Sequence, residues 1–566
     1  MSIAIGGNQQ LKRSPAAYAV VKLLRRLRVG PLFRWRFSGF RPQRILAEPV
    51  DLHLADPEMA HEFYHGRFAL AGRIVQTGAI SPFAVEPPTY GWEAALNDFS
   101  WLRHMDAAYT PLANAHARSL LNDWLEQSGK RVKGTAWQTD IAARRLIAWL
   151  CHARMLLDGA SENFEKRFLR SLGFHVRYLR TAIHSMEEDE NRLQAAAALC
   201  FASLSLPVSP SIKKTAQSQL VQSLTRQILP DGGHISRNPS VILSLLTDFI
   251  ALRHLYVHSK EAAPRLLLDS IERMLPALRF FIHQDQSLAH FNGVGPILPE
   301  RLAVVLGLDE TVGSPFSHTP YSGYQRLWAN NTTIIADTGT TPARPNSYQS
   351  AAGCLSFEMS SGTNRFIINA GIDPYGPSDY SFLARATAAH STATLNDTSS
   401  GKFQKRNGQR KVALLNGPTE INIQRIEGAD RMGFVASHNG YVSTFNLLHE
   451  RGLVLSADGH VIDGFDKFVS FNGATVKADG RDNVAVRFHL HPHVEVSHDG
   501  NSLRLEVMGG DAWSFMSPDA DIQLEDSIDF ADLNGPKRTR QIVLNFRPAL
   551  TEKIRWRFTR ITQANQ

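Results

Sequence analysis

The sequence predicts a multidomain α+β protein, with a helical first half and an antiparallel β-sandwich in the second half. Apolar residues recur at helical spacing from about residue 90 to 310, and they alternate along short segments after about residue 315. Helices first and strands second indicate separate layers, because an alternating α/β fold would mix the two patterns. A chain of 566 residues is also too long for one hydrophobic core, so two or three domains are expected.

Each half divides into recognisable segments. Helices are expected at 92–102, 141–150, 164–186, 193–204, 216–229, 241–256 and 262–281. Their regular recurrence favours paired helices stacked in a ring or a solenoid, although no exact sequence repeat is visible. Strands are expected at 326–329, 332–336, 354–359, 365–369, 484–490, 503–507 and 542–546, and turns rich in Gly, Asp and Asn separate them.

The net charge of +8 comes from an N-terminal arm. Residues 1–44 contain ten of the 61 Lys and Arg and no Asp or Glu, which leaves 51 basic against 53 acidic residues in the rest. Within this arm, residues 16–37 place apolar side chains on one helical face and basic ones opposite. Such a segment can lie on an anionic membrane surface, dock on an acidic partner, or pack on its own domain. Nucleic-acid binding is not expected, because no recognition motif accompanies the charge.

Cysteine content and hydropathy exclude several classes of protein. Cys151, Cys200 and Cys354 lie far apart, so they form neither a disulfide framework nor a CxxC metal site. No uncharged apolar run reaches about 18 residues, so no membrane-spanning helix is expected. A cleavable signal peptide is not expected either, since charged residues interrupt the short N-terminal apolar run.

Five sequence motifs resemble those of the heparinase II/III family of polysaccharide lyases, over roughly residues 90–550. They are the segment from Trp137 to Trp149 with Arg144-Arg145, Glu190-Asn-Arg-Leu193, Asp231-Gly-Gly-His-Ile-Ser-Arg237, Ala389-His-Ser-Thr392, and Ser437-His-Asn-Gly-Tyr441 followed by His449-Glu-Arg451. The resemblance implies an α/α toroid (an incomplete barrel) at 51–312 and an antiparallel β-sandwich at 313–566, and the charge distribution adds a basic arm at 1–50.

The resemblance also implies β-elimination at a uronic acid. This reaction needs donors that neutralise the carboxylate, a base for the C5 proton and an acid for the leaving oxygen. Asn191 would bind the carboxylate, and Arg192 or Arg237 could add a charge-assisted contact. His390 or His234 would serve as base or acid.

The sequence departs from the family pattern at two proposed catalytic positions. The family tyrosine and histidine that follow the Asp-Gly-Gly motif fall on Val241 and Ile242, and the family Asn-His is Asn-Arg here. Tyr321 or Tyr324 could supply the missing hydroxyl.

No cofactor is required for this chemistry, but some family members hold a structural zinc. His390, Asp397 and His438 could supply such a site with ligands that suit zinc. His390 could not then also act as the free acid or base.

The sequence therefore predicts a lyase that acts on an anionic, uronate-containing polysaccharide. Two alternatives remain: a carbohydrate-binding or scaffold protein that has lost the tyrosine-dependent chemistry, and a glycoside hydrolase. A hydrolase would need paired carboxylates, for which residues 187–190 and Asp231 are the obvious suppliers. The resemblance favours the cell envelope or periplasm, whereas the absence of a clear export signal favours the cytoplasm. The oligomeric state stays open.

Overall fold

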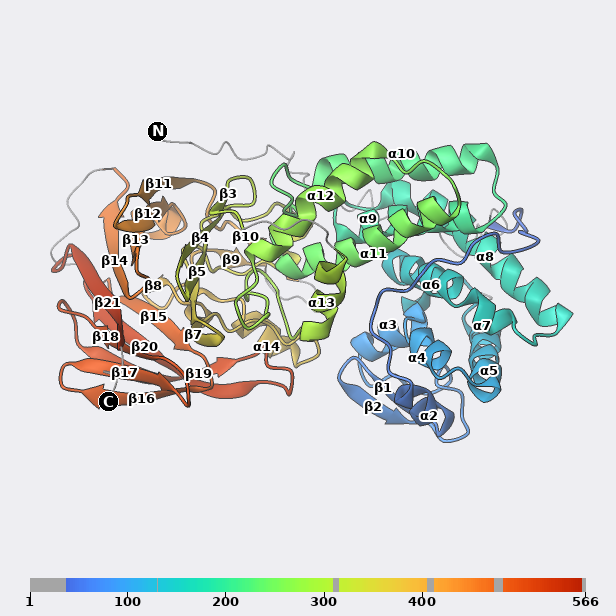
Figure 1. Cartoon of the computed structure of the whole chain (residues 1–566), viewed down its shortest axis with the longest axis horizontal. Coiled ribbons are helices and arrows are strands. Elements are labelled where there is room, and N and C mark those ends of the chain that lie inside the picture. Colours follow the sequence, from blue (N-terminus) through green and yellow to red (C-terminus); the bar gives the residue numbers. More distant parts are fainter. Residues whose placement is uncertain (1–36, 130, 309–314, 405–411, 473–481, 562–566) are drawn as a thin grey trace. The chain divides into compact units, whose positions relative to one another are not determined.

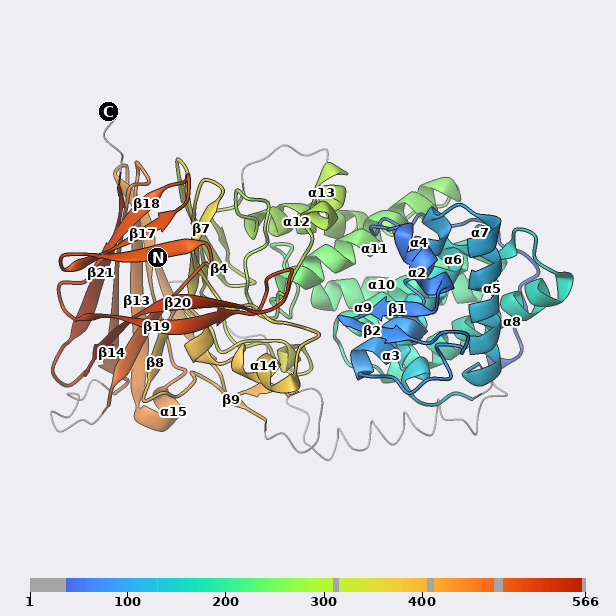
Figure 2. The ribbon, with the colours of Figure 1, turned by 90° about the horizontal axis from the view of Figure 1, so that it is seen from below.

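The computed structural model describes residues 37–129, 131–308, 315–404, 412–472 and 482–561. Their contacts divide the chain into two compact units (Figures 1 and 2). The helical unit contains the described residues of Leu11–Ile228 together with Ser244–Glu272, and the β unit contains Leu229–Leu243 and the described residues of Arg273–Gln566. The predicted amphipathic segment at 16–37 lies outside the described residues, apart from Phe37.

The helical unit confirms the helical first half. Its elements, apart from a hairpin of β1 (Arg67–Leu70) and β2 (Arg73–Gln76), are α2 (Glu58–Tyr64), α3 (Tyr90–Asp98), α4 (Leu102–Ala107), α5 (Pro111–Gln127), α6 (Thr139–Cys151), α7 (Ala153–Leu157), α8 (Glu162–Ala182), α9 (Glu190–Ser205), α10 (Pro210–Gln227) and parts of α11 (Pro239–His258) and α12 (Arg265–Phe280). Side chains that accept backbone N–H groups start several of them, among them Thr89, Ser161 and Asp189. The single helix expected at 92–102 is two, because Phe99 adopts a left-handed φ of 59°.

The core of the helical unit is rich in aromatic residues and contains a fully buried arginine. Arg145 is fully buried, lies 4.2 Å from the ring centroid of Trp124, and donates to the carbonyl oxygens of Asn97 and Ala136. These contacts give the Arg144-Arg145 motif a structural role at its second residue.

Helix α11 has the length and apolar composition of a membrane-crossing helix, by those two criteria alone. Within its most apolar window 67% is buried inside the structure. Burial of this extent is typical of the core helix of a folded domain. Asp248 lies within this helix, so no uncharged run of the required length occurs.

The described part of the β unit contains two large antiparallel sheets that enclose one apolar core, and a small sheet of β9 (Lys402–Phe403) and β10 (Leu414–Leu415). One sheet has the order β11-β12-β13-β14-β21-β18-β17-β16, and the other has the order β19-β20-β15-β7-β6-β5-β4-β3, with β8 paired to β15. The strands of the second sheet are β3 (His318–Thr319), β4 (Tyr324–Ala329), β5 (Thr332–Asp337), β6 (Phe357–Ser361), β7 (Asn364–Ile368), β8 (Ala393–Leu395), β15 (Val484–Leu490), β19 (Ile522–Asp529) and β20 (Lys537–Phe546).

The strands of the first sheet are β11 (Ile421–Glu427), β12 (Arg431–His438), β13 (Leu447–Ser456), β14 (Val461–Ser470), β16 (Val494–Asp499), β17 (Ser502–Val507), β18 (Ala512–Met516) and β21 (Lys553–Ile561). Alternate residues of β21 are buried, as expected for a strand with one face on the core. The predicted sandwich strands are confirmed, with one change: β6 begins at Phe357 because Leu355 has a φ of 61°.

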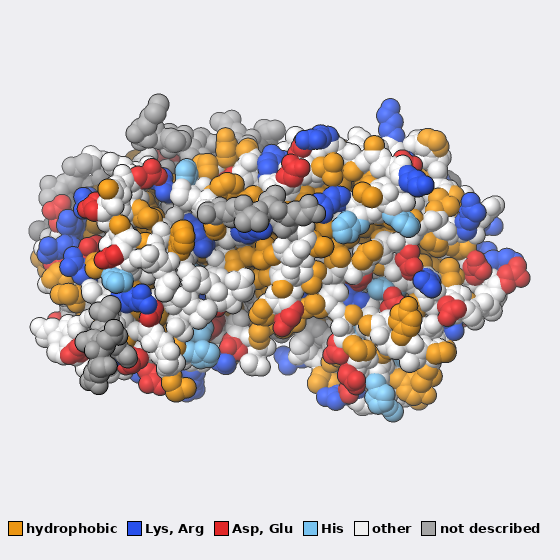
Figure 3. Space-filling view, viewed as in Figure 1, with side chains coloured by type: hydrophobic (Ala, Val, Ile, Leu, Met, Phe, Trp, Pro, Cys, Tyr) orange, Lys and Arg blue, Asp and Glu red, His pale blue; other side chains and the backbone are white. Residues whose placement is uncertain are grey.

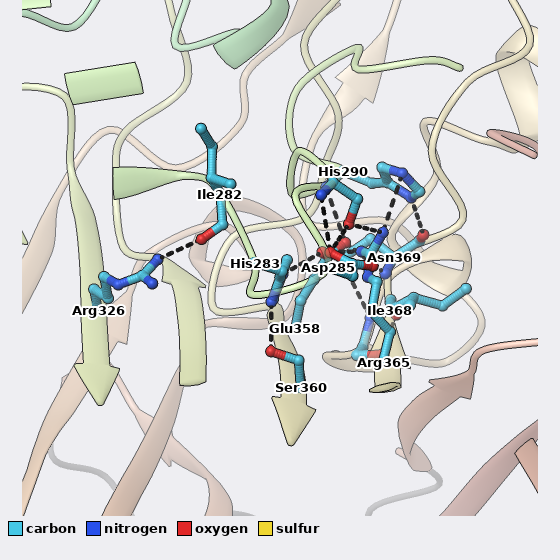
Figure 4. A network of polar contacts seen from close by, with 12 residues as sticks. Ile282, His283, Asp285, His290, Arg326, Glu358, Ser360, Arg365, Ile368 and Asn369 are labelled. Atoms are coloured by element: carbon cyan, nitrogen blue, oxygen red, sulfur yellow. Dashed lines mark hydrogen bonds and ion pairs between the residues drawn. The ribbon is translucent and has the colours of Figure 1, made fainter. Parts of the chain in front are cut away.

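Every residue of β5 and β6 is buried, so this part of the second sheet is covered on both faces. Residues 280–292 of the same unit supply part of the outer cover. Arg326 on β4 donates to the carbonyl oxygens of Phe280 (2.7 Å) and Ile282 (3.1 Å), and His283 contacts Ser360 on β6 (Figure 4). The polar residues of this covered face position the candidate site.

Candidate functional site

The Asp231-Gly-Gly turn, in the loop after α10, is hydrogen-bonded to the loop before β4. The carboxylate of Asp231 accepts backbone N–H groups from Tyr321 (2.8 Å) and Ser322 (2.7 Å). A Cβ atom at Gly232, where φ is 81°, would lie 2.0 Å from the carbonyl oxygen of Arg273. The motif therefore has a clear structural function in this chain.

Arg237 is held by the same part of the β unit. Its guanidinium donates to the carbonyl oxygens of Ser322 (2.7 Å), Gly323 (3.1 Å) and Thr340 (3.1 Å), and it forms a short ion pair with Asp337. Four of its five N–H groups are thus used within the protein. Burial opposes the charge, but Asp337 outweighs burial and raises the pKa of Arg237.

The side chains of His234 and Tyr324 are buried and form hydrogen bonds within the protein. His234 accepts the backbone N–H of Ser236 at Nδ1 (3.1 Å), and burial lowers its pKa to about 3. The hydroxyl of Tyr324 donates to the carbonyl oxygen of Arg237 (2.6 Å) and accepts from Asn292 (2.8 Å). Burial raises the pKa of Tyr324 well above its ordinary value, so its hydroxyl keeps its proton near neutrality. Tyr321, in contrast, is 59% exposed.

His390 differs from His234 in the ring nitrogen that carries the hydrogen. It follows a short turn at Thr387–Ala389, is 3% exposed, and its Nδ1 lies 2.9 Å from the carbonyl oxygen of Ala386. A carbonyl oxygen can only accept, so Nδ1 carries the hydrogen and Nε2 carries the lone pair. Burial lowers the pKa of His390, against the bond to Ala386, which raises it. The ring is therefore neutral near pH 7, with a basic nitrogen at Nε2.

Two buried ionic networks hold the residue that follows His390. The side chain of Asn369 accepts a hydrogen bond from the backbone N–H of Ser391 (3.1 Å), and Arg451 donates to the carbonyl oxygen of Ser391 (2.7 Å). Asn369 donates in turn to the buried carboxylate of Glu358 (Figure 4), and Arg451 forms two bonds of 2.8 and 3.0 Å with Asp466. The backbone beside His390 is thus fixed on both sides.

Glu358 is the centre of the first network. Besides Asn369, it accepts from the backbone of His290 (3.0 Å) and from His283 Nε2 (3.2 Å), and it pairs with Arg365 (Figure 4). Burial opposes its charge, but Arg365 and the histidines outweigh burial and lower its pKa. A fully buried carboxylate is tolerated here because four groups donate to it.

The residues predicted to bind zinc are not joined by contacts that suit a metal. His438 accepts the N–H of Gly440 at Nδ1 (3.0 Å) and contacts His449 through Nε2 (3.2 Å), while His449 Nε2 binds Asp466 (2.8 Å). Both nitrogens of His438 are therefore used. Asp397 is 92% exposed and lies 3.7 Å from Arg487. Over the described ranges no group of three His, Cys, Asp or Glu could hold a metal ion.

Asn191 and Arg192 belong to the helical unit. Asp189 caps α9 by accepting the N–H of Arg192 (3.1 Å), and it also accepts from the side chain of Asn191 (3.2 Å). The guanidinium of Arg192 donates to Met186 O and pairs with Glu188, both at 3.2 Å. Glu188 also pairs with Arg226, so this carboxylate is neutralised within its own unit.

Val241 and Ile242 are buried in the first turn of α11, and neither offers a hydroxyl or an imidazole. Other polar residues of the site were missed by the sequence reasoning. Asp337, Asn292 and Glu358 are buried and hold the predicted residues, but they carry no local motif. Asn292-Gly293 reads only as a turn signal, and Asp337 only as the end of a strand.

Known proteins match both the sequence and the fold. Residues 311–557 match the family described as Heparinase II/III-like, C-terminal. FtsZ-localized protein C of Caulobacter vibrioides (strain NA1000 / CB15N) is 28% identical over 543 residues, which cover 94% of this chain and 92% of that protein.

Among solved structures, a crystal structure of heparinase III superimposes with a TM-score of 0.70 at 14% identity, covering 96% of this chain and 89% of that one. A mutant of the heparan sulfate lyase HepC from Pedobacter heparinus gives 0.63 at 16% identity, covering 98% and 90%. These likenesses confirm the predicted order of helical region and antiparallel sandwich. Residues 311–557 thus match the C-terminal domain described as Heparinase II/III-like, and the chain has the fold of these heparinase and heparan sulfate lyase structures.

Proposed function

We propose that this protein binds an acidic polysaccharide through its heparinase fold and does not cleave it by elimination. The observation that carries the proposal is that the polar groups of Tyr324 and Arg237 are used inside the β unit. The Tyr324 hydroxyl donates to the carbonyl oxygen of Arg237, and the Arg237 guanidinium donates to Ser322 O and pairs with Asp337. Elimination takes the C5 proton, breaks the C4–O bond, forms a C4=C5 double bond and returns a proton to the leaving oxygen. The residue that we align with the family tyrosine is Val241, whose side chain cannot donate the proton for that last step.

A role beside FtsZ is the second part of the proposal. The relative named FtsZ-localized protein C aligns along 94% of this chain and 92% of its own length, so the similarity extends through both halves of the chain. We propose that this chain also localises with FtsZ, and that the basic segment at 16–37 contacts an anionic membrane surface there. A fluorescent fusion tests the first point: a diffuse signal, or one independent of FtsZ, contradicts it.

The glycan proposal is tested with a panel of uronate polysaccharides, including heparan sulfate, hyaluronan, alginate and bacterial exopolysaccharides. We expect the purified protein to retard at least one of them on a gel, without the ultraviolet absorbance of a 4,5-unsaturated uronate. A rise in absorbance overturns the proposal. Failure to retard any glycan overturns the binding part alone.

Elimination remains a second candidate function because one observation favours it. The lone pair on His390 Nε2, fixed by the bond from Nδ1 to Ala386, is what a base for the C5 proton needs. If the absorbance rises, His390→Ala must abolish it while the protein stays folded. Tyr321→Phe would then test whether the exposed hydroxyl replaces the family tyrosine.

A further inference from the structure

Helix α8 carries three arginines on one face. Arg170, Arg177 and Arg180 are separated by seven and three residues, a spacing that places them on the same side of a helix. Arg170 is exposed, and the other two are half-buried. Neighbouring cations of this helix do have carboxylate partners, in the pairs Lys166–Glu162 and Arg167–Glu126.

A fourth arginine comes from the chain that crosses this face. The strap, residues 37–44, lies across α8 at Gly173, where an added Cβ would come within 2.3 Å of the carbonyl oxygen of Phe40. The ring of Phe37 lies 5.5 Å from that of Phe174. Arg41 is exposed on this strap, between Phe40 and Pro42, which both lie against Gly173 (the strap is the dark-blue chain beside α8 in Figures 1 and 2).

These arginines are a local feature of the surface. Acidic and basic side chains are interspersed over much of the face shown in Figure 3, in line with the near-neutral body of the chain. Within the described residues, no carboxylate lies within ion-pair distance of Arg41, Arg170, Arg177 or Arg180. A group of unpaired guanidinium groups raises the local positive potential and favours an anionic partner.

We propose that Arg41, Arg170, Arg177 and Arg180 form a basic ridge that binds the phosphate groups of an anionic lipid bilayer. Guanidinium groups bind phosphate in a bidentate manner and keep their charge at all physiological pH values. The ridge is continuous in sequence with residues 1–36, which contain eight Lys or Arg and no acidic residue. It therefore adds a second, folded contact to the membrane contact proposed for 16–37, and it rests on that proposal.

A lipid surface fits the ridge better than an acidic protein does. Protein interfaces have an apolar or aromatic centre, and no large apolar side chain is strongly exposed in the described part of the strap or of α8. Adsorption to a bilayer needs only clustered charge near the head groups.

The test uses the full chain and flotation with phosphatidylcholine vesicles that contain or lack phosphatidylglycerol. The ridge variant is Arg41→Glu with Arg170→Glu and Arg180→Glu, and it leaves Arg177 in place because that side chain packs against Gly39. The control reverses three exposed cations elsewhere in the helical unit: Arg73→Glu, Arg131→Glu and Lys133→Glu. We expect the ridge variant to bind anionic vesicles on the order of a hundredfold more weakly, with the control much less affected.

An arm variant, with Arg25, Arg26 and Arg28 changed to Glu, separates the two proposals. If it loses binding while the ridge variant keeps full affinity, the arm contact stands and the ridge is wrong. If it keeps binding while the ridge variant loses it, the ridge stands without the arm. Equal losses of vesicle binding in the ridge variant and its control overturn the ridge. A second assay measures binding to polyglutamate, an acidic polypeptide: a ridge variant that loses this binding but still binds anionic vesicles also overturns the ridge.

Discussion

The guanidinium of Arg451 donates a 2.7 Å hydrogen bond to the carbonyl oxygen of Ser391, the residue that follows His390. The same guanidinium is held in two bonds by Asp466, and both side chains are fully buried. An ionic pair far from solvent is therefore part of the scaffold of the candidate site. His390 depends for its place on residues that no ligand needs to touch.

Removing Arg451 should destabilise the protein strongly. Arg451→Ala leaves the Asp466 carboxylate buried without its cation, which costs about 3–5 kcal/mol of the free energy of unfolding. Urea denaturation measures the loss. The control is Arg557→Ala, which breaks the half-exposed pair with Asp463 and should cost less than about 1 kcal/mol. Similar values for both variants would contradict the role of burial.

Glu358 should make stability dependent on acid pH. Its pKa in the folded protein lies below the ordinary value of 4.5, so its stabilising effect is complete above that value and is lost as the pH falls toward the folded pKa. Asp466 adds a loss of the same sign. Denaturation below pH 4.5 should therefore show a smaller fall for Glu358→Gln than for the wild type. An unchanged pH slope in the variant would contradict this assignment.

Tyr324→Phe should affect folding more than binding. The change removes the donor to Arg237 O and the acceptor for Asn292, which costs about 1–3 kcal/mol of stability. Because the hydroxyl is used inside the β unit, we expect glycan retardation to stay at the wild-type level. A variant that loses glycan binding at full stability would show that Tyr324 contacts the ligand.

Gly353→Ala should disturb the ring of His390. An added Cβ would lie 2.5 Å from Cδ2 of the imidazole, so the ring or the backbone must move. We expect glycan binding to fall about tenfold, a change of ~1.4 kcal/mol. Gly307→Ala is the matched control, since its Cβ meets nothing within 4 Å. Equal binding by both variants would indicate that His390 is not at the ligand.

The tautomer of His390 can be observed directly. With ¹⁵N-labelled histidine, Nε2 of His390 should show the shift of an unprotonated nitrogen at neutral pH, because Nδ1 donates to Ala386. Burial lowers the pKa, so this signal should persist below pH 6.5. His390→Gln identifies the resonance. A protonated Nε2 at neutral pH would remove the argument for a base at this position.

Local patterns in the sequence were sufficient for the fold and insufficient for the site. Apolar spacing predicted α8 and β15 because each depends on neighbours in the chain, and Asp231-Gly-Gly predicted a turn for the same reason. The role of Arg237 depends on Ser322 and Asp337, which lie 85 and 100 residues further along. Nothing near Arg237 in the sequence distinguishes a buried structural cation from one that binds a carboxylate.

The ion pair between Arg237 and Asp337 limits where the β-sandwich can be separated from the rest of the chain. Asp337 is 4% exposed, and the cation that neutralises it lies upstream of the matched family region at 311–557. A fragment cut at that boundary would expose the carbonyl oxygens of Ser322 and Gly323 and leave a buried anion uncompensated. The β unit is therefore discontinuous in the sequence: it includes residues 229–243, and residues 244–272 of the helical unit separate them from the rest during synthesis.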